Sequence, residues 1–77
     1  MADYKIIEAE AREEVHIKVN SQYNNLNADV VIVEERITAR LFGTISELLV
    51  VKKDAVVYIH GTIKGKTENQ GGKIHVY

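Results

Sequence analysis

The chain has 77 residues without cysteine, proline or tryptophan and a formal net charge of −1, which excludes disulfides and allows one small domain that buries only about 60% of its unfolded surface. Its 45% hydrophobic and 27% charged residues exclude a disordered chain, and no apolar run approaches the roughly 20 residues that span a bilayer. No signal-peptide pattern opens the chain, so we expect a single cytoplasmic domain that is stabilised by association with further chains.

The first 27 residues are expected to form an N-terminal strand or cap and an Asn-rich loop. Residues 3–14 favour helix and strand equally, because helix-favouring Ala, Glu and Arg follow a short alternating stretch. A half-buried strand is predicted over residues 15–19, where the apolar side chains alternate at Val15, Ile17 and Val19. Residues 20–27 contain four Asn in eight positions, which predicts a loop with left-handed or Asx-turn conformations.

The composition predicts an all-β protein. Ile, Val and Thr together make up 23 of the 77 residues, and such β-branched side chains are stiff at χ1 and pack well on a pleated surface. Leu, the usual filler of helices, occurs only four times.

A repeat of about 18 residues organises residues 28–77, and self-similarity at a fixed period is typical of stacked repeat architectures. The apolar doublet Ala39/Leu41 recurs as Val57/Ile59 and, one position earlier than the period would give, as Ile74/Val76. The doublet Val31/Val33 recurs as Leu49/Val51 and then, more polar, as Thr67/Asn69, while Gly43-Thr44-Ile45 recurs as Gly61-Thr62-Ile63. Asn25 stands one period before Gly43 and is the non-glycine residue type that best tolerates a positive φ.

This period favours a short parallel β-helix of about three coils. An antiparallel meander would have a strand every 8–12 residues and hairpin dipeptides such as Asn-Gly or Asp-Gly, and the chain contains neither dipeptide. A solenoid instead stacks equivalent residues in ladders roughly 4.8 Å apart, with glycines at its corners. We therefore expect one domain with its coils in residues 28–77.

The stretch from Leu41 to Tyr77 resembles the bactofilins and the small polymer-forming β-helix proteins related to them. The shared elements are the Gly-Thr-Ile corners at Gly43 and Gly61, the charged turn Lys52-Lys53-Asp54, the glycine pair Gly71-Gly72 and the apolar doublets between them. Ser46-Glu47 stands where the family has the second glycine of the first corner. The resemblance implies non-catalytic self-assembly into homo-oligomers, including an end-to-end polymer.

Alternation along the strands predicts an interaction face. If the apolar doublets point inward, their neighbours point outward on three successive coils. We expect His75 to stack with Tyr58, and His60 with Phe42 and Tyr77. The predicted interaction face consists of Arg40, Phe42, Tyr58, His60, His75 and Tyr77.

Three occupants of this face remain open. Residues 1–19 could fold back and cover it, a second copy of the chain could bind it, or it could bind a foreign ligand. Tyr and Arg are enriched at interface anchors, and a contiguous exposed aromatic patch marks an interaction surface. A compact module of this kind could bind or inhibit another protein, including as a phage- or mobile-element-encoded factor.

The final strand is a second candidate for association. Open strand edges pair with other chains unless they are capped or charged, so Lys73, Ile74 and Val76 are predicted to form a pairing edge. Residues 1–35 carry eight acids and three bases, and residues 36–77 carry seven bases and three acids. This asymmetry favours a head-to-tail contact between copies.

No catalytic, cofactor or metal site is expected. Gly61 to Thr67 differs from a phosphate-binding P-loop because three residues, not four, separate its glycines and no helix can follow. His16 is expected to be a polar surface residue, and His60 and His75 are not expected to share one ladder position, which disfavours a metal site. No nucleophile–His–acid arrangement can be assembled. The sequence pI near 6.3 argues against a nucleic-acid partner. We therefore predict a non-enzymatic, self-associating β-helix, with the protein-binding module as the alternative.

Overall fold

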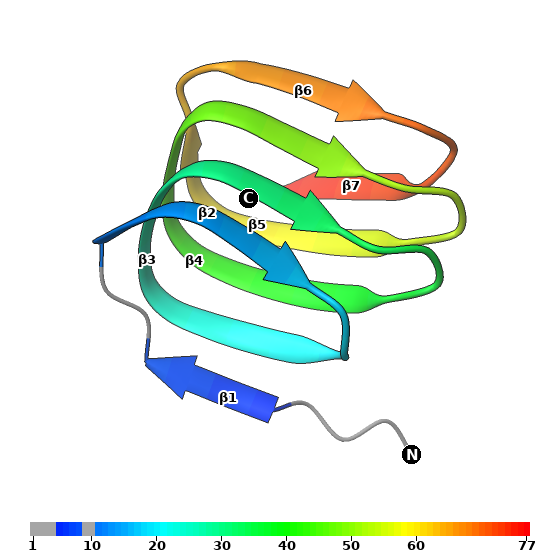
Figure 1. Ribbon diagram of the computed structural model, residues 1–77, viewed down its shortest axis with the longest axis horizontal. Helices are drawn as coiled ribbons and strands as arrows, with labels where there is room; N and C mark the ends of the chain where they lie inside the picture. Colours follow the sequence, from blue (N-terminus) through cyan, green and yellow to red (C-terminus); the bar gives the residue numbers. More distant parts are fainter. Residues whose placement is uncertain (1–4, 9–10) are drawn as a thin grey trace.

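A computed structural model describes residues 5–8 and 11–77, which form a parallel β-helix (Figure 1). Each strand pairs with its neighbours in parallel. The strands are β1 (Lys5–Glu8), β2 (Ala11–Ile17), β3 (Ser21–Val33), β4 (Thr38–Val51), β5 (Val56–Ile63), β6 (Lys66–Asn69) and β7 (Lys73–Val76). Within these described residues, no helix is long and apolar enough to cross a membrane.

The coils are built from two ladders of strands. Ladder 1 contains β1, the first halves of β3 and β4, then β5 and β7. Ladder 2 contains β2, the second halves of β3 and β4, then β6. The long strands β3 and β4 contribute to both ladders, and Figure 1 shows them bending where they pass from one ladder to the other. The blue strands lie at one end of the stack, and the orange β6 and red β7 lie at the other.

The predicted all-β solenoid and its period of about 18 residues are confirmed. Ala39 pairs with Val57 and Leu41 with Ile59, in both cases one full period apart. The next step is one position shorter, as predicted, because Val57 pairs with Ile74. The stack has about four turns, one more than the sequence predicted.

The core lies between the two ladders and is filled by the inward-pointing doublets. Side chains alternate between the two faces of a strand, so residues of the central strands β3, β4 and β5 alternate between the interior and the outer surface, whereas β6 is exposed along its whole length. The largest fully buried apolar side chains are Ile17, Leu26, Leu41, Ile45, Leu49, Ile59, Val31, Val33, Val51 and Val57. Leu26 and Ile45 fill the region where the long strands bend, so the core is continuous along the stack.

Two glycines permit the close stacking of these bends. Gly61 lies directly on Gly43 in the register of β4 and β5. A β-carbon on Gly61 would collide with the carbonyl oxygen of Gly43, and one on Gly43 would collide with the carbonyl oxygen of Leu26. The Gly-Thr-Ile repeat therefore marks places where only a residue without a side chain fits.

The predicted Asn-rich loop over residues 20–27 is wrong, because β3 begins at Ser21 and continues to Val33. The expected positive φ at Asn25 is confirmed at 55°. It occurs inside the strand, where the register with β4 shifts between Tyr23 and Leu26. One extra residue at this point forms a bulge, so the Asn is used for a bend and not for a loop.

The N-terminal segment is part of the solenoid, so the predicted start of the coils at residue 28 is wrong. β1 pairs with the start of β3, and β2 pairs with its end. Both offsets are slightly shorter than the period of the later coils, since Lys5 pairs with Ser21 and Ala11 with Asn27. This confirms the strand alternative over 5–8 and 11–14, and the other residues of 3–14 lie outside the described residues.

Val19 does not share the buried face of Val15 and Ile17, so this part of the predicted strand over residues 15–19 is wrong. β2 ends at Ile17, and the Val19 side chain is 54% exposed. The alternation of apolar residues therefore continues in the sequence beyond the point at which the strand stops.

Candidate interaction surface

The six residues of the predicted interaction face lie together on the outer surface of ladder 1. Five of them lie on β4, β5 and β7, which are neighbours in the sheet, and Tyr77 directly follows β7. Each alternates with a core residue such as Leu41, Ile59 or Ile74. The spacing of the doublets thus predicts both the positions of these side chains and the face on which they lie.

One column of outward side chains contains Arg40, Tyr58 and His75. Arg40 pairs with Tyr58 and Tyr58 with His75 in the strand register. The Tyr58 and His75 rings are stacked, with centroids 5.2 Å apart and planes inclined by 14°. The Arg40 guanidinium carbon lies 6.0 Å from the centroid of the Tyr58 ring, which is the range of a cation–π contact.

The second column contains Phe42, His60 and Tyr77. Their ring centroids are 4.5 Å apart between Phe42 and His60 and 4.7 Å apart between His60 and Tyr77. The interplanar angles are 8° and 10°. The predicted stacking partners are therefore confirmed in both columns. We call the two columns together the ring face.

The geometry of the ring face determines what it can bind. Because the rings stack on one another along the ladder, their faces cover each other and their edges point outward. A flat base or ring therefore has no gap to enter within a column. Tyr77 is the last of the described residues in its column, and its side chain is 69% exposed. The ring face thus offers ring edges to a partner, with the Arg40 guanidinium beside them.

The described part of the N-terminal segment does not cover the ring face. β1 adds to ladder 1 beside β3, and β2 adds to ladder 2. Of residues 1–19, positions 1–4 and 9–10 lie outside the described residues. The first of the three predicted occupants is therefore wrong for 5–8 and 11–19.

Towards β1, the two columns continue with polar side chains that the sequence reasoning missed. Gln22 pairs with Arg40 in the strand register, and its amide donates to Asn24 Oδ1 at 3.2 Å. Asn24 in turn donates to Glu8 Oε2 at 2.6 Å. The sequence predicted a loop over residues 20–27, so Gln22 and Asn24 were not expected to lie on a ladder. The available sign was that Gln22 stands one full period before Arg40.

A charged cluster at another corner was also missed. The Glu34 carboxylate accepts hydrogen bonds from Lys52 Nζ at 3.0 and 3.2 Å and contacts His16 Nε2. These bonds, first that of His16 and then that of Lys52, lower the pKa of Glu34. Glu34 and Lys52 stand one period apart in the sequence, and this spacing could have predicted that they lie side by side on neighbouring coils. Over the described part of the chain, no three His, Asp or Glu residues are grouped to hold a metal ion.

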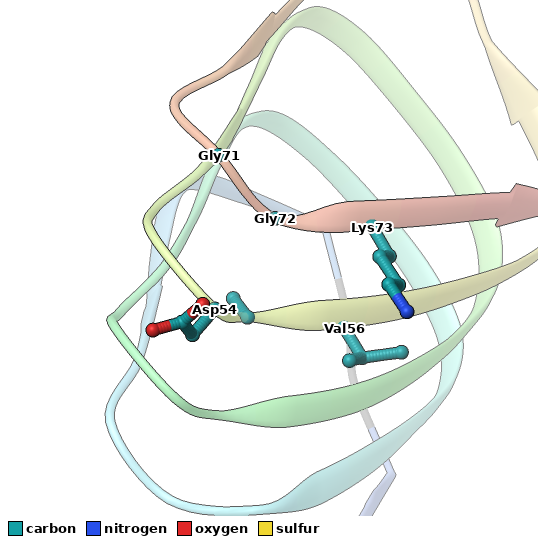
Figure 2. A pocket seen from close by; sticks show the side chains of 6 residues that line it. Asp54, Val56, Gly71, Gly72 and Lys73 are labelled. Atoms are coloured by element: carbon teal, nitrogen blue, oxygen red, sulfur yellow. The ribbon is translucent and has the colours of Figure 1, made fainter.

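A hollow of about 250 Å³ opens at the last corner, beside the start of β7 (Figure 2). Its charged lining residues are Asp54 and Lys73, and the remainder is Ala55, Val56 and the Gly71-Gly72 pair. Such a lining contains no imidazole, hydroxyl or thiol.

The predicted pairing edge lies on β7, at the end of ladder 1. The amide of Lys73 donates to Ala55 and that of Tyr77 to Ile59, at 2.8 and 2.9 Å. Among the described residues, β7 pairs with β5 alone. Ile74 is half-buried and the Val76 side chain is 60% exposed. The inward-pointing residues of β7 are therefore only partly covered by the residues that the structure describes.

Comparisons with known proteins add no relative. No family model, curated protein or solved structure matches this chain.

Proposed function

We propose that this chain is a non-enzymatic structural protein whose β-helix self-associates end to end. The observation that carries the proposal is the pairing of the outermost strands. Among the described residues, β6 and β7 at one end, and β1 and β2 at the other, each pair on one side only. Each therefore has a row of backbone donors and acceptors available to a further strand.

The side chains at the two ends support pairing with a second copy. At the β7 end, Val76 belongs to the inward-pointing row that continues from Leu41 and Ile59. At the β1 end, the same row finishes with the half-buried Ile7. Stacking one copy on the next would cover Val76 with Ile7 and extend the apolar core, which is the main favourable term in association.

The charges favour a head-to-tail order. Residues 1–35 carry a net charge of −5 and residues 36–77 a net charge of +4. In ladder 2, Glu14 on β2 and Lys66 on β6 occupy the same position along the strands. A head-to-tail stack would therefore set Lys66 beside Glu14 of the next copy, whereas two β6 ends brought together would oppose like charges. The resemblance to bactofilins is consistent with this proposal.

The test introduces a charge on the pairing edge. Lysine on an edge strand is the common natural means of blocking edge-to-edge pairing, so Val76→Lys should remove species larger than a dimer in sedimentation velocity. Val19→Lys is the matched control, since Val19 is 54% exposed and lies outside the strands. If wild type forms no such species at high concentration, or if both variants behave alike, the proposal is wrong.

A second candidate function is binding of another protein by the ring face. The observation that favours it is the alignment of Arg40 and Tyr58, two residue types enriched in binding hot spots, on a partly exposed surface. Replacing Arg40, Tyr58 and His75 together by Ala separates the two functions. An unchanged oligomer with a lost binding partner supports the second function, while loss of the oligomer would place the contact between copies on the ring face and not on the strand edge.

A further inference from the structure

The outer surface of ladder 2 carries an apolar patch that the fold does not use. β3 and β4 read as continuous apolar runs there, and strands of this kind are buried on both faces. Their inward residues fill the core, and the alternate residues point outward. The outward residues are Val30 and Ile32 on β3 and Leu48 and Val50 on β4. Val30, Ile32 and Leu48 are half-buried, and Val50 is 8% exposed, so the first three residues supply most of the accessible apolar surface.

Charged residues flank this apolar patch with opposite signs. The strand register places Glu14, Val30, Leu48 and Lys66 in one column across ladder 2. His16, Ile32, Val50 and Glu68 form the adjacent column. Each column thus has two apolar residues in the middle. Its ends are an acid and a base in the first column, Glu14 and Lys66, and a hydrogen-bonding pair in the second, His16 and Glu68. We call these eight residues the ladder 2 face.

This order makes the ladder 2 face complementary to itself. A two-fold rotation about an axis parallel to the strands reverses the order of the strands and keeps each position along them. After this rotation, Glu14 faces Lys66 of the second copy, and Val30 faces Leu48 of the second copy. In the other column, His16 faces Glu68 and Ile32 faces Val50. The two apolar pairs and the Glu14–Lys66 pair are therefore matched, and His16, whose Nε2 contacts Glu34 within its own chain, lies opposite Glu68 of the second copy.

We propose that two copies of this chain pair through the ladder 2 face with two-fold symmetry. Such an isologous contact is closed and uses the same surface on both chains. It involves neither the ring face nor the β7 edge, so it does not rest on the end-to-end function and would join two assemblies side by side. The aligned packing of two sheet faces buries the apolar rows between them.

The small size of the face is typical of a weak contact. The two longest extents of the molecule are 29 and 25 Å, which limits a flat face to about 700 Å², below the roughly 800 Å² that each partner contributes to a standard interface. We therefore expect a dimer with a micromolar dissociation constant. Sedimentation equilibrium over a wide concentration range measures it directly.

The test uses Val76→Lys as background, in which end-to-end pairing is blocked. In this background, Val30→Lys and Leu48→Glu should each weaken the dimer at least tenfold, because each buries two charges against apolar residues. An equimolar mixture of the two should form a heterodimer, since the introduced lysine of one chain then faces the introduced glutamate of the other. Val56→Lys, at a half-buried outward position of ladder 1, is the control and should leave the dimer unchanged.

Circular dichroism would detect whether these substitutions impair folding. If they do, a substitution at an exposed position provides a second test. Glu14 is exposed, and Glu14→Lys would set like charges opposite Lys66 twice in the symmetric dimer. It should weaken the dimer, and adding Lys66→Glu in the same chain should restore it.

Three results would overturn the proposal. They are a Val76→Lys variant that is monomeric throughout, a Val56→Lys variant that weakens the dimer as much as Val30→Lys, and a failure of both the mixture and the charge swap to restore pairing. These outcomes leave the end-to-end function untouched, because that function is read from species larger than a dimer in the wild type.

Discussion

His60 stacks on Phe42 with ring centroids 4.5 Å apart and planes inclined by only 8°. The two residues stand one period apart in the sequence and directly beside each other in the register of β4 and β5. Stacked aromatic pairs contribute about 0.5–1.5 kcal/mol beyond the area that they bury. In a double-mutant cycle of Phe42→Ala and His60→Ala, we expect a coupling free energy of about 1 kcal/mol in urea unfolding. Additive effects would show that the stack does not stabilise the fold.

Gly61 should tolerate no side chain. Because a β-carbon there would collide with the backbone of Gly43, Gly61→Ala must push two coils apart. We expect it to lower the free energy of unfolding by at least about 2 kcal/mol. Thr62→Ala, at the next and exposed position, is the control and should change stability by less than about 0.5 kcal/mol.

Arg36 adopts a left-handed backbone conformation with φ of 63°, as does Asp54 one coil later with φ of 62°. This conformation costs a residue with a β-carbon roughly 1 kcal/mol, and Asn adopts it more readily. Arg36→Asn should therefore raise the free energy of unfolding by about 0.5 kcal/mol. A lower melting temperature for this variant would show that the Arg side chain contributes more than the backbone strain costs.

Glu34 should make the stability of the fold dependent on acidic pH. Its pKa is lowered in the folded state by the bonds from His16 and Lys52. The resulting stabilisation is present above the pKa of the unfolded chain, near 4.5, and is lost as the pH falls through the lower pKa of the folded state. Melting curves between pH 7 and about 3 should therefore show a smaller loss of stability for Glu34→Gln than for wild type. Glu35→Gln, at the exposed neighbouring position, is the control, and equal acid sensitivity of Glu34→Gln and wild type would contradict the assignment.

The sequence predicts those parts of the fold in which apolar doublets and corner glycines recur together. Ala39, Val57 and Ile74 show this best, because one repeat identifies their ladder, their inward direction and, through their neighbours, the ring face. The repeat fails where its residues become polar. Gln22 and Asn24 occupy ladder positions, but their side chains are typical of loops, so only the pairing with β4 reveals them.

Two further features depend on contacts that local patterns do not contain. The offset of β1 and β2 from β3 is shorter than the period of the later coils, which conceals the first coil from a search at a fixed period. The outward apolar residues Val30 and Leu48 look like core residues in the sequence. Their position on the outer surface becomes evident only when Val31 and Leu49 are seen to fill the interior.

Sedimentation of the unmodified chain over a range of concentrations tests self-association most directly. With self-association, the weight-average mass should rise with concentration, through a dimer and into larger species. In Val76→Lys this growth should stop at the dimer. A single species of 8.7 kDa at every concentration, up to about 1 mM, would contradict it.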